Sequence, residues 1–79
     1  MTIVSKRVGQ IVRARRKFLQ LRQRDLAELA GVTLRGLTEI ENGRGNPTLN
    51  QLSKIASVLG LEVTLSQKPP DAASQRLLP

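Results

Sequence analysis

Residues 21–47 constrain the fold most, because their helix-forming runs are short and the breaks between them are sharply placed. We expect one helix over residues 23–30 that ends at Gly31, since glycine readily adopts the left-handed conformation found after helix C-termini. Thr33 predicts a second helix start, because its hydroxyl can accept a backbone N–H from the next turn. Residues 42–47 have the composition of a loop. Two short helices joined by a tight turn are therefore expected.

Two further helices are expected, one on each side of this pair. The first covers residues 5–19, where apolar side chains recur at three- and four-residue steps. The last follows Thr48, where Gln51 completes a capping box, and it ends at Gly60. The side chains expected on the inner faces are, in chain order, Val8, Ile11, Val12, Arg15, Leu19, Leu26, Ala27, Leu29, Ala30, Leu37, Ile40, Leu49, Leu52, Ile55, Ala56 and Leu59.

The pattern changes after the fourth expected helix. Residues 61–66 alternate apolar and polar side chains, which is typical of a strand, and Leu61, Val63 and Leu65 share one face. A single strand in a helical domain leaves its hydrogen-bonding edges open, so we expect pairing with the same strand of a second copy. Residues 67–79 contain three prolines and are expected to form a flexible tail. Residues 1–66 are then one domain.

Composition narrows the range of functions. The 79 residues include 13 Lys and Arg but 6 Asp and Glu, and this net charge of +7 fits nucleic acid first and an anionic membrane second. Because Cys and His are absent, we expect no enzyme, metal or cofactor. No apolar run approaches the roughly 20 residues that span a bilayer, and no secretory signal is evident, so a cytoplasmic protein is expected. The single aromatic residue argues against stacking on RNA bases.

The third expected helix carries the side chains best suited to reading DNA. In a pair of this kind the second helix enters the major groove. An arginine such as Arg35 can donate two hydrogen bonds to guanine, and an apolar side chain can contact a thymine methyl. A glutamate there can accept from cytosine N4, but it can equally repel phosphate or pair with a neighbouring arginine. The expected base-reading residues are Thr33, Leu34, Arg35, Thr38 and Glu39; the alternative is a solvated helix face.

The loop after this helix is the expected phosphate clamp. Asn42 and Arg44 begin it, and backbone N–H groups together with the Arg44 guanidinium can hold a phosphate. The alternative is that Asn-Gly here is only a turn. The remaining basic residues are expected to form a solvated face: Arg13, Arg15, Lys17 and Arg24.

Four linked elements resemble the Xre, or Cro/repressor, helix-turn-helix family. QRDLA at residues 23–27 looks like its Q-x-x-L-A helix, and AGVT at 30–33 is similar to its turn. IENG at 40–43 and NPTL at 46–49 match its I-E-x-G and N-P-[ST]-L elements. The resemblance covers about residues 8–61. It implies an all-α, lambda-repressor-like domain of four to five helices that represses transcription as a homodimer on a palindromic operator of double-stranded DNA.

The resemblance also implies roles for particular residues. Gln23 matches a glutamine that bonds a DNA phosphate. Arg16 and Glu41 match a pair that joins the first helix to the end of the third. The family usually has Ser or Thr where this chain has Arg22, so the second helix is expected to lack its cap, at a cost of about 1 kcal/mol. Arg22 is expected to reach a phosphate instead.

The end of the matched region points to one subgroup of the family. Many phage-type repressors continue into a fifth helix, whereas residues 61–65, LEVTL, are predicted to be a strand. This resembles the HipB-like antitoxins, in which an intersubunit strand pair helps to join the dimer. The resemblance implies an antitoxin that represses its own operon and binds a HipA-like Ser/Thr kinase toxin. Two alternatives stay open: a kinase-neutralising protein whose DNA binding is only autoregulatory, and a stand-alone phage-type repressor.

Overall fold

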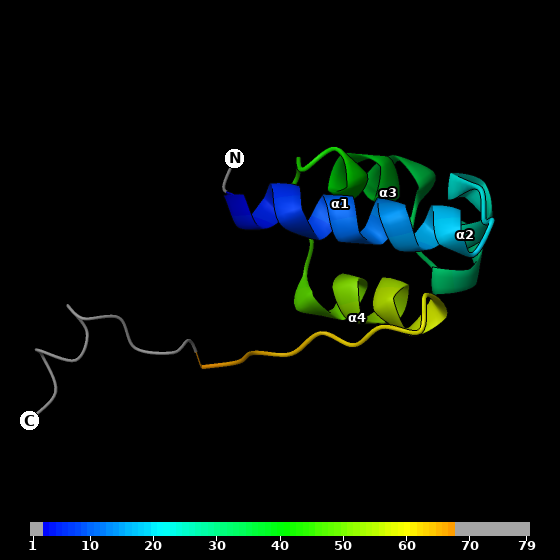
Figure 1. The fold of residues 1–79 in the computed structure, drawn as a ribbon. Helices are drawn as coiled ribbons and strands as arrows, with labels where there is room; N and C mark the ends of the chain where they lie inside the picture. The colour runs from blue at the N-terminus through cyan, green and yellow to red at the C-terminus, as the bar shows by residue number, and fades with distance from the viewer. Residues whose placement is uncertain (1–2, 68–79) are drawn as a thin grey trace, which may run out of the picture.

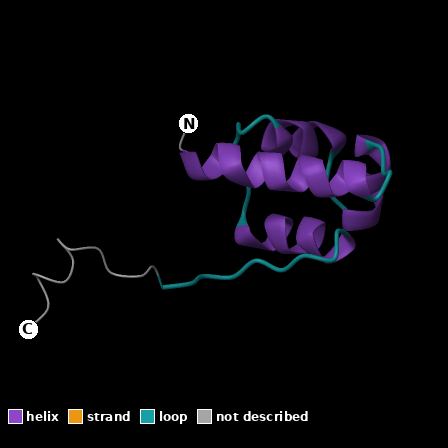
Figure 2. Cartoon of the chain, in the orientation of Figure 1, coloured by secondary structure: helices purple, strands orange, loops and turns teal. Residues whose placement is uncertain are grey.

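The computed structural model describes residues 3–67, and the part of the chain that it describes contains helices and loops but no strand (Figures 1 and 2). The helices are α1 (Ile3–Phe18), α2 (Gln23–Ala30), α3 (Leu34–Glu41) and α4 (Leu49–Val58). The all-helical fold and its four expected helices are confirmed, and residues 3–67 contain no fifth helix. The expected tail at 68–79 lies outside the described residues.

The helices pack against one another in pairs. Helix α1 packs along α3, and α2 packs against both α3 and α4 (Figure 1). The short α2 therefore links the α1–α3 pair to α4. Within residues 3–67, none of these helices is long and apolar enough to cross a membrane.

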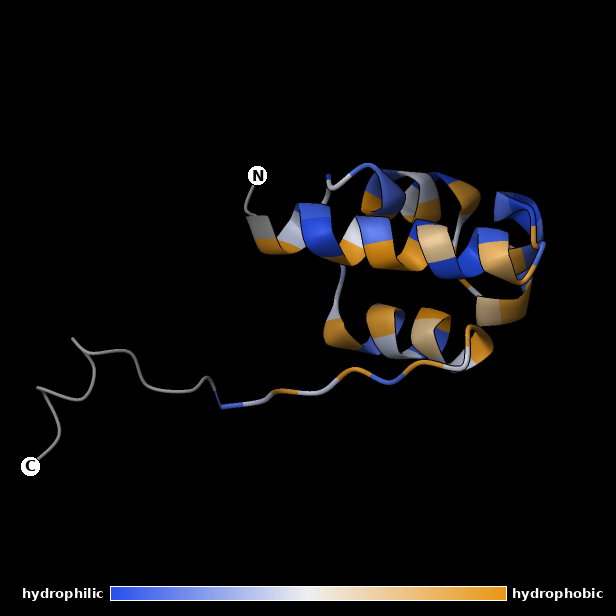
Figure 3. Cartoon of the chain, viewed as in Figure 1, coloured by the Kyte–Doolittle hydropathy of each residue, from blue (hydrophilic) through white to orange (hydrophobic). Residues whose placement is uncertain are grey.

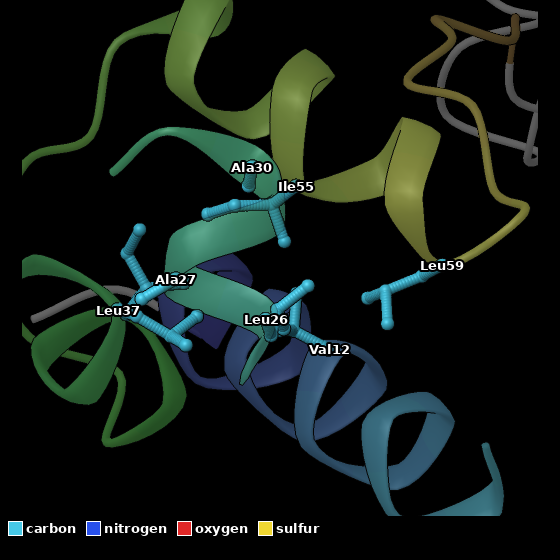
Figure 4. Close-up of a cluster of buried hydrophobic side chains, with 8 residues drawn as sticks. Val12, Leu26, Ala27, Ala30, Leu37, Ile55 and Leu59 are labelled. Carbon is cyan, nitrogen blue, oxygen red and sulfur yellow. The ribbon is translucent and has the colours of Figure 1, made fainter. Parts of the chain in front are cut away.

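The core at the centre of this arrangement is aliphatic. Its side chains come from all four helices and from the residue after α4, and the apolar faces of the helices point inward (Figures 3 and 4). The fully buried large side chains are Leu26, Leu37, Ile55 and Leu59. Smaller residues of α2 let the neighbouring helices approach closely, since Ala27 and Ala30 are also buried.

Four residues expected on inner faces are exposed instead: Ile11, Leu19, Leu29 and Leu49. The expectation was wrong for a geometric reason. A helical repeat of apolar residues identifies the apolar side of a helix, but it does not give the width or length of the face that a neighbouring helix covers. On α2 the covered stripe is Leu26, Ala27 and Ala30, and Leu29 lies beyond its edge.

The predicted ends of the short helices are confirmed. Gly31 has φ of 70°, the left-handed conformation that ends α2. The Thr33 hydroxyl accepts the Gly36 N–H at 3.0 Å and so caps α3. Thr48 and Gln51 form the expected reciprocal capping box at the start of α4, with N–O distances of 2.9 and 3.0 Å.

Residues 61–67 form an extended segment that runs beside α4 (Figure 1). The Leu61 N–H donates to the Ala56 carbonyl at 2.8 Å, which attaches the start of this segment to α4. Val63 and Leu65 are exposed. A strand requires a partner strand, and a single described chain offers residues 61–67 none. The expected strand is thus not formed within one copy.

Candidate nucleic-acid interface

The α2–turn–α3 unit holds the outer face of α3 in a fixed orientation. On the inner face, Leu37 and Ile40 are buried in the core. Thr33, Leu34 and Arg35 are exposed, while Thr38 and Glu39 are half-buried. The structure therefore brings the five expected base-reading side chains together, on the outer side of α3 and at its N-cap.

An ion pair joins two of these side chains. Arg35 Nε lies 3.5 Å from Glu39 Oε1, and the two side chains are 90% and 44% exposed. Of the roles considered for Glu39, pairing with a neighbouring arginine is the one that the structure without DNA shows. Exposed pairs of this kind contribute little stability, because water screens them. Arg35 consequently keeps the freedom to turn toward another acceptor.

The four expected phosphate-binding residues flank α3 at two places. Arg22 and Gln23 lie at the start of α2, and Asn42 and Arg44 follow α3. Arg22, Asn42 and Arg44 are exposed, whereas Gln23 is half-buried.

The backbone of the loop after α3 is already engaged. The N–H groups of Asn42, Gly43 and Arg44 donate to the carbonyls of Thr38, Ile40 and Glu39, at 3.1, 3.0 and 2.8 Å. These three groups are not available to a ligand without breaking the turn. The expected clamp therefore loses these three backbone groups, whereas the exposed side chains of Asn42 and Arg44 stay candidates for binding phosphate.

The start of α2 has a cap that the sequence analysis missed. The Asp25 carboxylate accepts the Arg22 backbone N–H at 2.9 Å, and it also accepts the Arg22 guanidinium at 3.0 Å through both oxygens. The side chain of Arg22 does not cap the helix, but Asp25 supplies the reciprocal half of a capping box. The expected lack of the usual N-cap side chain is confirmed, but the sequence analysis did not foresee that Asp25 would bond the Arg22 N–H. The signal was available as an acidic residue three positions after the N-cap.

This contact also changes both ionisable groups. The hydrogen bond from the Arg22 guanidinium lowers the pKa of Asp25, with a further contribution from the Arg22 backbone N–H. The same pairing raises the pKa of Arg22 above its ordinary value. Both groups are accordingly held in their charged forms.

Arg16 and Glu41 form a buried ion pair between α1 and the last residue of α3. Arg16 Nε donates to Glu41 Oε2 at 2.7 Å and Nη2 donates to Oε1 at 3.0 Å. The side chains are 11% and 1% exposed. Arg16 Nη1 also donates to the Leu21 carbonyl at 2.8 Å. The hydrogen bond to Glu41 raises the pKa of Arg16, and burial opposes part of that rise.

The buried pair continues into a polar chain that reaches the outer face of α3. Gln23 Nε2 donates to Glu41 Oε1 at 3.1 Å. The Thr38 hydroxyl lies 3.4 Å from Gln23 Oε1 and 2.9 Å from the Leu34 carbonyl oxygen. Gln23, a candidate phosphate-binding residue, thus contacts Thr38, a candidate base-reading residue, directly and links it to Glu41. Sequence patterns within one helix could not reveal the contacts of Gln23 with Glu41 and Thr38, because these contacts join α2 to α3.

Arg15 was expected both on the apolar face of the first helix and among the solvated basic residues, and the structure shows it half-buried. Arg15 Nε donates to the Leu59 carbonyl at 2.9 Å, and its guanidinium carbon lies 5.1 Å from the centre of the Phe18 ring. A cation that bonds the last carbonyls of a helix is favourable there. Arg15 therefore ties α1 to the end of α4.

A groove of about 380 Å³ lies beside α3, on the side that carries Gly36. Arg44 and Lys54 supply its positive charge, and Glu39 supplies a negative one. Residues 3–67 contain no cluster of three or more side chains suited to binding a metal ion.

Comparisons with known proteins agree on one family. Residues 12–65 match the profile described as Helix-turn-helix. The immunity repressor protein of Bacillus phage phi105 is 42% identical over 57 residues, which are 72% of this chain and 40% of that protein. An uncharacterized HTH-type transcriptional regulator of Methanothermobacter thermautotrophicus is 42% identical over 52 residues, which are 66% of this chain and 75% of that protein.

A solved structure resembles the fold. The crystal structure of the clp gene regulator ClgR from Corynebacterium glutamicum superposes with a TM-score of 0.72 and 26% sequence identity. The alignment covers 77% of this chain and 65% of that one. The chain thus spans about two fifths of the phage repressor and about two thirds of the ClgR chain.

Proposed function

Since this chain belongs to the helix-turn-helix family, we propose that it is a sequence-specific DNA-binding regulator that represses transcription. The observation that carries the proposal is the outer face of α3, where hydrogen-bonding side chains stand exposed on a helix fixed by a buried core. Helix α3 lies in the major groove of DNA. The start of α2 and the loop after α3 contact the sugar–phosphate backbone of the DNA. The names of the relatives, a phage repressor and two regulators, support the same role.

The proposed roles divide between base reading and positioning. Arg35 leaves Glu39 and donates to O6 and N7 of a guanine, which is the most common specific contact of this kind. Arg22 and Arg44 bind phosphates without regard to sequence. Gln23 has one amide hydrogen bonded to Glu41, so its second amide hydrogen can reach a phosphate.

The proposal is tested by selecting binding sites from a randomised duplex library with the wild type, Arg35→Ala and Arg44→Ala. Loss of Arg35 is expected to relax the preference at one base position by about 10-fold or more. Loss of Arg44 is expected to weaken binding to all sequences by a similar factor and to reduce the salt dependence. Failure of the wild type to enrich any sequence, or identical behaviour of the two variants, would contradict the proposal.

The proposal further includes that the protein binds DNA as a homodimer. Residues 61–66 of two copies pair as antiparallel strands, which places two α3 helices on half-sites about 34–36 Å apart in a palindromic operator. The free Leu65 side chain and the exposed Val63 support this, because pairing would cover them. Leu61 is half-buried and anchors the segment.

Sedimentation equilibrium tests the dimer. Leu65→Asp is expected to give a monomer, because it places a charge in the paired face, whereas Ser66→Asp changes the opposite face and leaves the dimer intact. A monomeric wild type at concentrations that saturate DNA would overturn this part of the proposal.

Two biological roles fit a regulator of this size. The likeness to a phage immunity repressor supports a stand-alone phage-type repressor. The extended, non-helical segment after Gly60 supports the HipB-like antitoxin, with a HipA-like kinase as its partner and DNA binding as autoregulation. Co-expression with the product of the adjacent gene separates them. A stable complex with a kinase supports the antitoxin, and binding to DNA without such a partner supports the repressor.

A further inference from the structure

The buried carboxylate of Glu41 determines which way the amide of Gln23 faces. An ionised carboxylate only accepts hydrogen bonds, and both Glu41 oxygens already accept from Arg16. The third donor is Gln23 Nε2, at 3.1 Å from Oε1. Turning the amide over would place its oxygen against a carboxylate that is 1% exposed, which is strongly unfavourable. Gln23 therefore presents its amide oxygen to Thr38.

The Thr38 hydroxyl is consequently surrounded by acceptors on its protein side. A hydroxyl has one hydrogen to donate and two lone pairs. The Leu34 carbonyl oxygen lies 2.9 Å from Thr38 Oγ1, and Gln23 Oε1 lies 3.4 Å from it. Whichever of the two receives the hydrogen, that hydrogen points into the protein. The side of Oγ1 that faces away from the protein then carries only lone pairs.

We propose that Thr38 is a specificity-determining residue that acts only as an acceptor, so that the base opposite it must present an exocyclic amine. In the major groove those amines are N6 of adenine and N4 of cytosine. Guanine and thymine present acceptors at the corresponding edges, and they are disfavoured there. A threonine is otherwise able to contact donors and acceptors alike, so the restriction comes from Gln23 and Leu34. The inference rests on the proposed function, since it requires α3 in the major groove.

The same geometry separates Thr38 from the phosphate-binding residues. Phosphate oxygens are acceptors, so they gain nothing from a hydroxyl whose hydrogen is directed elsewhere. Arg22 and Arg44 offer only donors and suit phosphate. Thr38 is therefore assigned to a base.

The test is site selection from a randomised duplex library with the wild type, Thr38→Val, Thr38→Ser and Arg35→Ala. The wild type is expected to select adenine or cytosine at one position of each half-site. Thr38→Val has nearly the same shape but no acceptor, and it is expected to lose about 3- to 10-fold of that preference. Thr38→Ser keeps the hydroxyl and the preference. Arg35→Ala is the matched control on the same face, and it leaves this position unchanged while relaxing another.

Base analogues give a second readout on unmodified protein. Replacing the selected adenine by purine, or cytosine by pyrimidin-2-one, removes the amine and with it one hydrogen bond of the base pair, so binding of the same two duplexes by Thr38→Val is the reference. The wild type is expected to bind the analogue duplex about 3- to 10-fold more weakly, and Thr38→Val is expected to bind both duplexes equally. Equal binding of the two duplexes by the wild type overturns the inference by itself, so the test stays decisive even if the valine variant is unstable.

The outcomes separate the two levels of the proposal. If the wild type enriches no sequence, the proposed function fails and the inference fails with it. If the wild type selects sites but Thr38→Val selects the same ones with the same preferences, only the inference is overturned. A Thr38-dependent preference for guanine or thymine, or an amine-free analogue bound as tightly as the parent duplex, also overturns it.

Discussion

Among the single residues, Glu41 holds the largest number of other side chains in place. It accepts hydrogen bonds from Arg16 and Gln23, and Gln23 in turn contacts the Thr38 hydroxyl. Removing one partner of a buried ion pair leaves a buried charge without compensation. Arg16→Leu is expected to cost about 3–5 kcal/mol of unfolding free energy. Cores of chains this short supply roughly 3–5 kcal/mol in total, so the variant is expected to be largely unfolded at 25 °C. Urea denaturation followed by circular dichroism measures this.

Two comparisons sharpen that experiment. The exposed pair offers the control, because Arg22→Leu breaks an ion pair that water screens and is expected to change the urea midpoint far less. The double variant Arg16→Leu with Glu41→Leu leaves neither charge behind and is expected to regain most of the loss. If Arg16→Leu and Arg22→Leu lose equal stability, burial of the Arg16–Glu41 pair does not have the importance assigned to it.

Asp25 gives a prediction about acid stability. The pKa of Asp25 is lower in the folded chain than in the unfolded chain, because Arg22 donates to the charged carboxylate. The contribution to stability is therefore fully present above the unfolded pKa, and it is lost as the pH falls through the folded pKa. Asp25→Asn is expected to flatten the fall of the urea midpoint between about pH 5 and pH 2. Glu28→Gln on the same helix is the control, because Glu28 belongs to none of the ion pairs within residues 3–67. An equal effect of this variant would contradict the assignment.

Among the elements, the crossing of α1 over α3 depends on one glycine. A methyl group at Gly9 would overlap the carbonyl oxygen of Ile40 and lie 2.8 Å from that of Glu41. Gly9→Ala is expected to cost about 1–3 kcal/mol, because the two helix backbones must separate. Without this close approach, the same change in a helix interior would add about 1 kcal/mol of stability. Thermal unfolding therefore distinguishes a close helix contact from an uncrowded glycine, because Gly9→Ala lowers the melting temperature in the first case and raises it in the second. The substitution Gln10→Ala at the exposed neighbouring position provides the control.

The elements also show how far sequence reasoning extends. The bounds of α2 and the starts of α3 and α4 were predictable, because Gly31, Thr33 and Thr48 act through local hydrogen bonds. The exposure of Leu29 and Leu49 could not be predicted from the sequence, because it depends on where a neighbouring helix ends.

The candidate site divides in the same way. The residues on the outer face of α3 follow from helical repeat, whereas the contact of Arg15 with Leu59 and the chain from Glu41 to Thr38 join separate elements. The pairing of residues 61–66 depends on a second copy, so it stays a prediction.

On the scale of the whole molecule, charge determines how binding responds to salt. The net charge is +7, and Arg22 and Arg44 from two copies would neutralise about four phosphates. The logarithm of the binding constant is then expected to fall against the logarithm of salt concentration with a slope of about −3.6. Fluorescence anisotropy should show about 150-fold weaker binding at 200 mM than at 50 mM salt. A slope near zero would exclude the phosphate contacts assigned to these arginines.

The orientation of the whole molecule on DNA is the central claim, and an NMR titration of the labelled protein with its selected duplex tests it most directly. Backbone amide shifts are expected to concentrate at residues 22–24, 33–39 and 42–46, on one face of the molecule. The exposed positions Arg7, Arg13 and Lys17 of α1 are expected to change little. Shifts centred on α1, with the amides of α3 unmoved, would contradict the account.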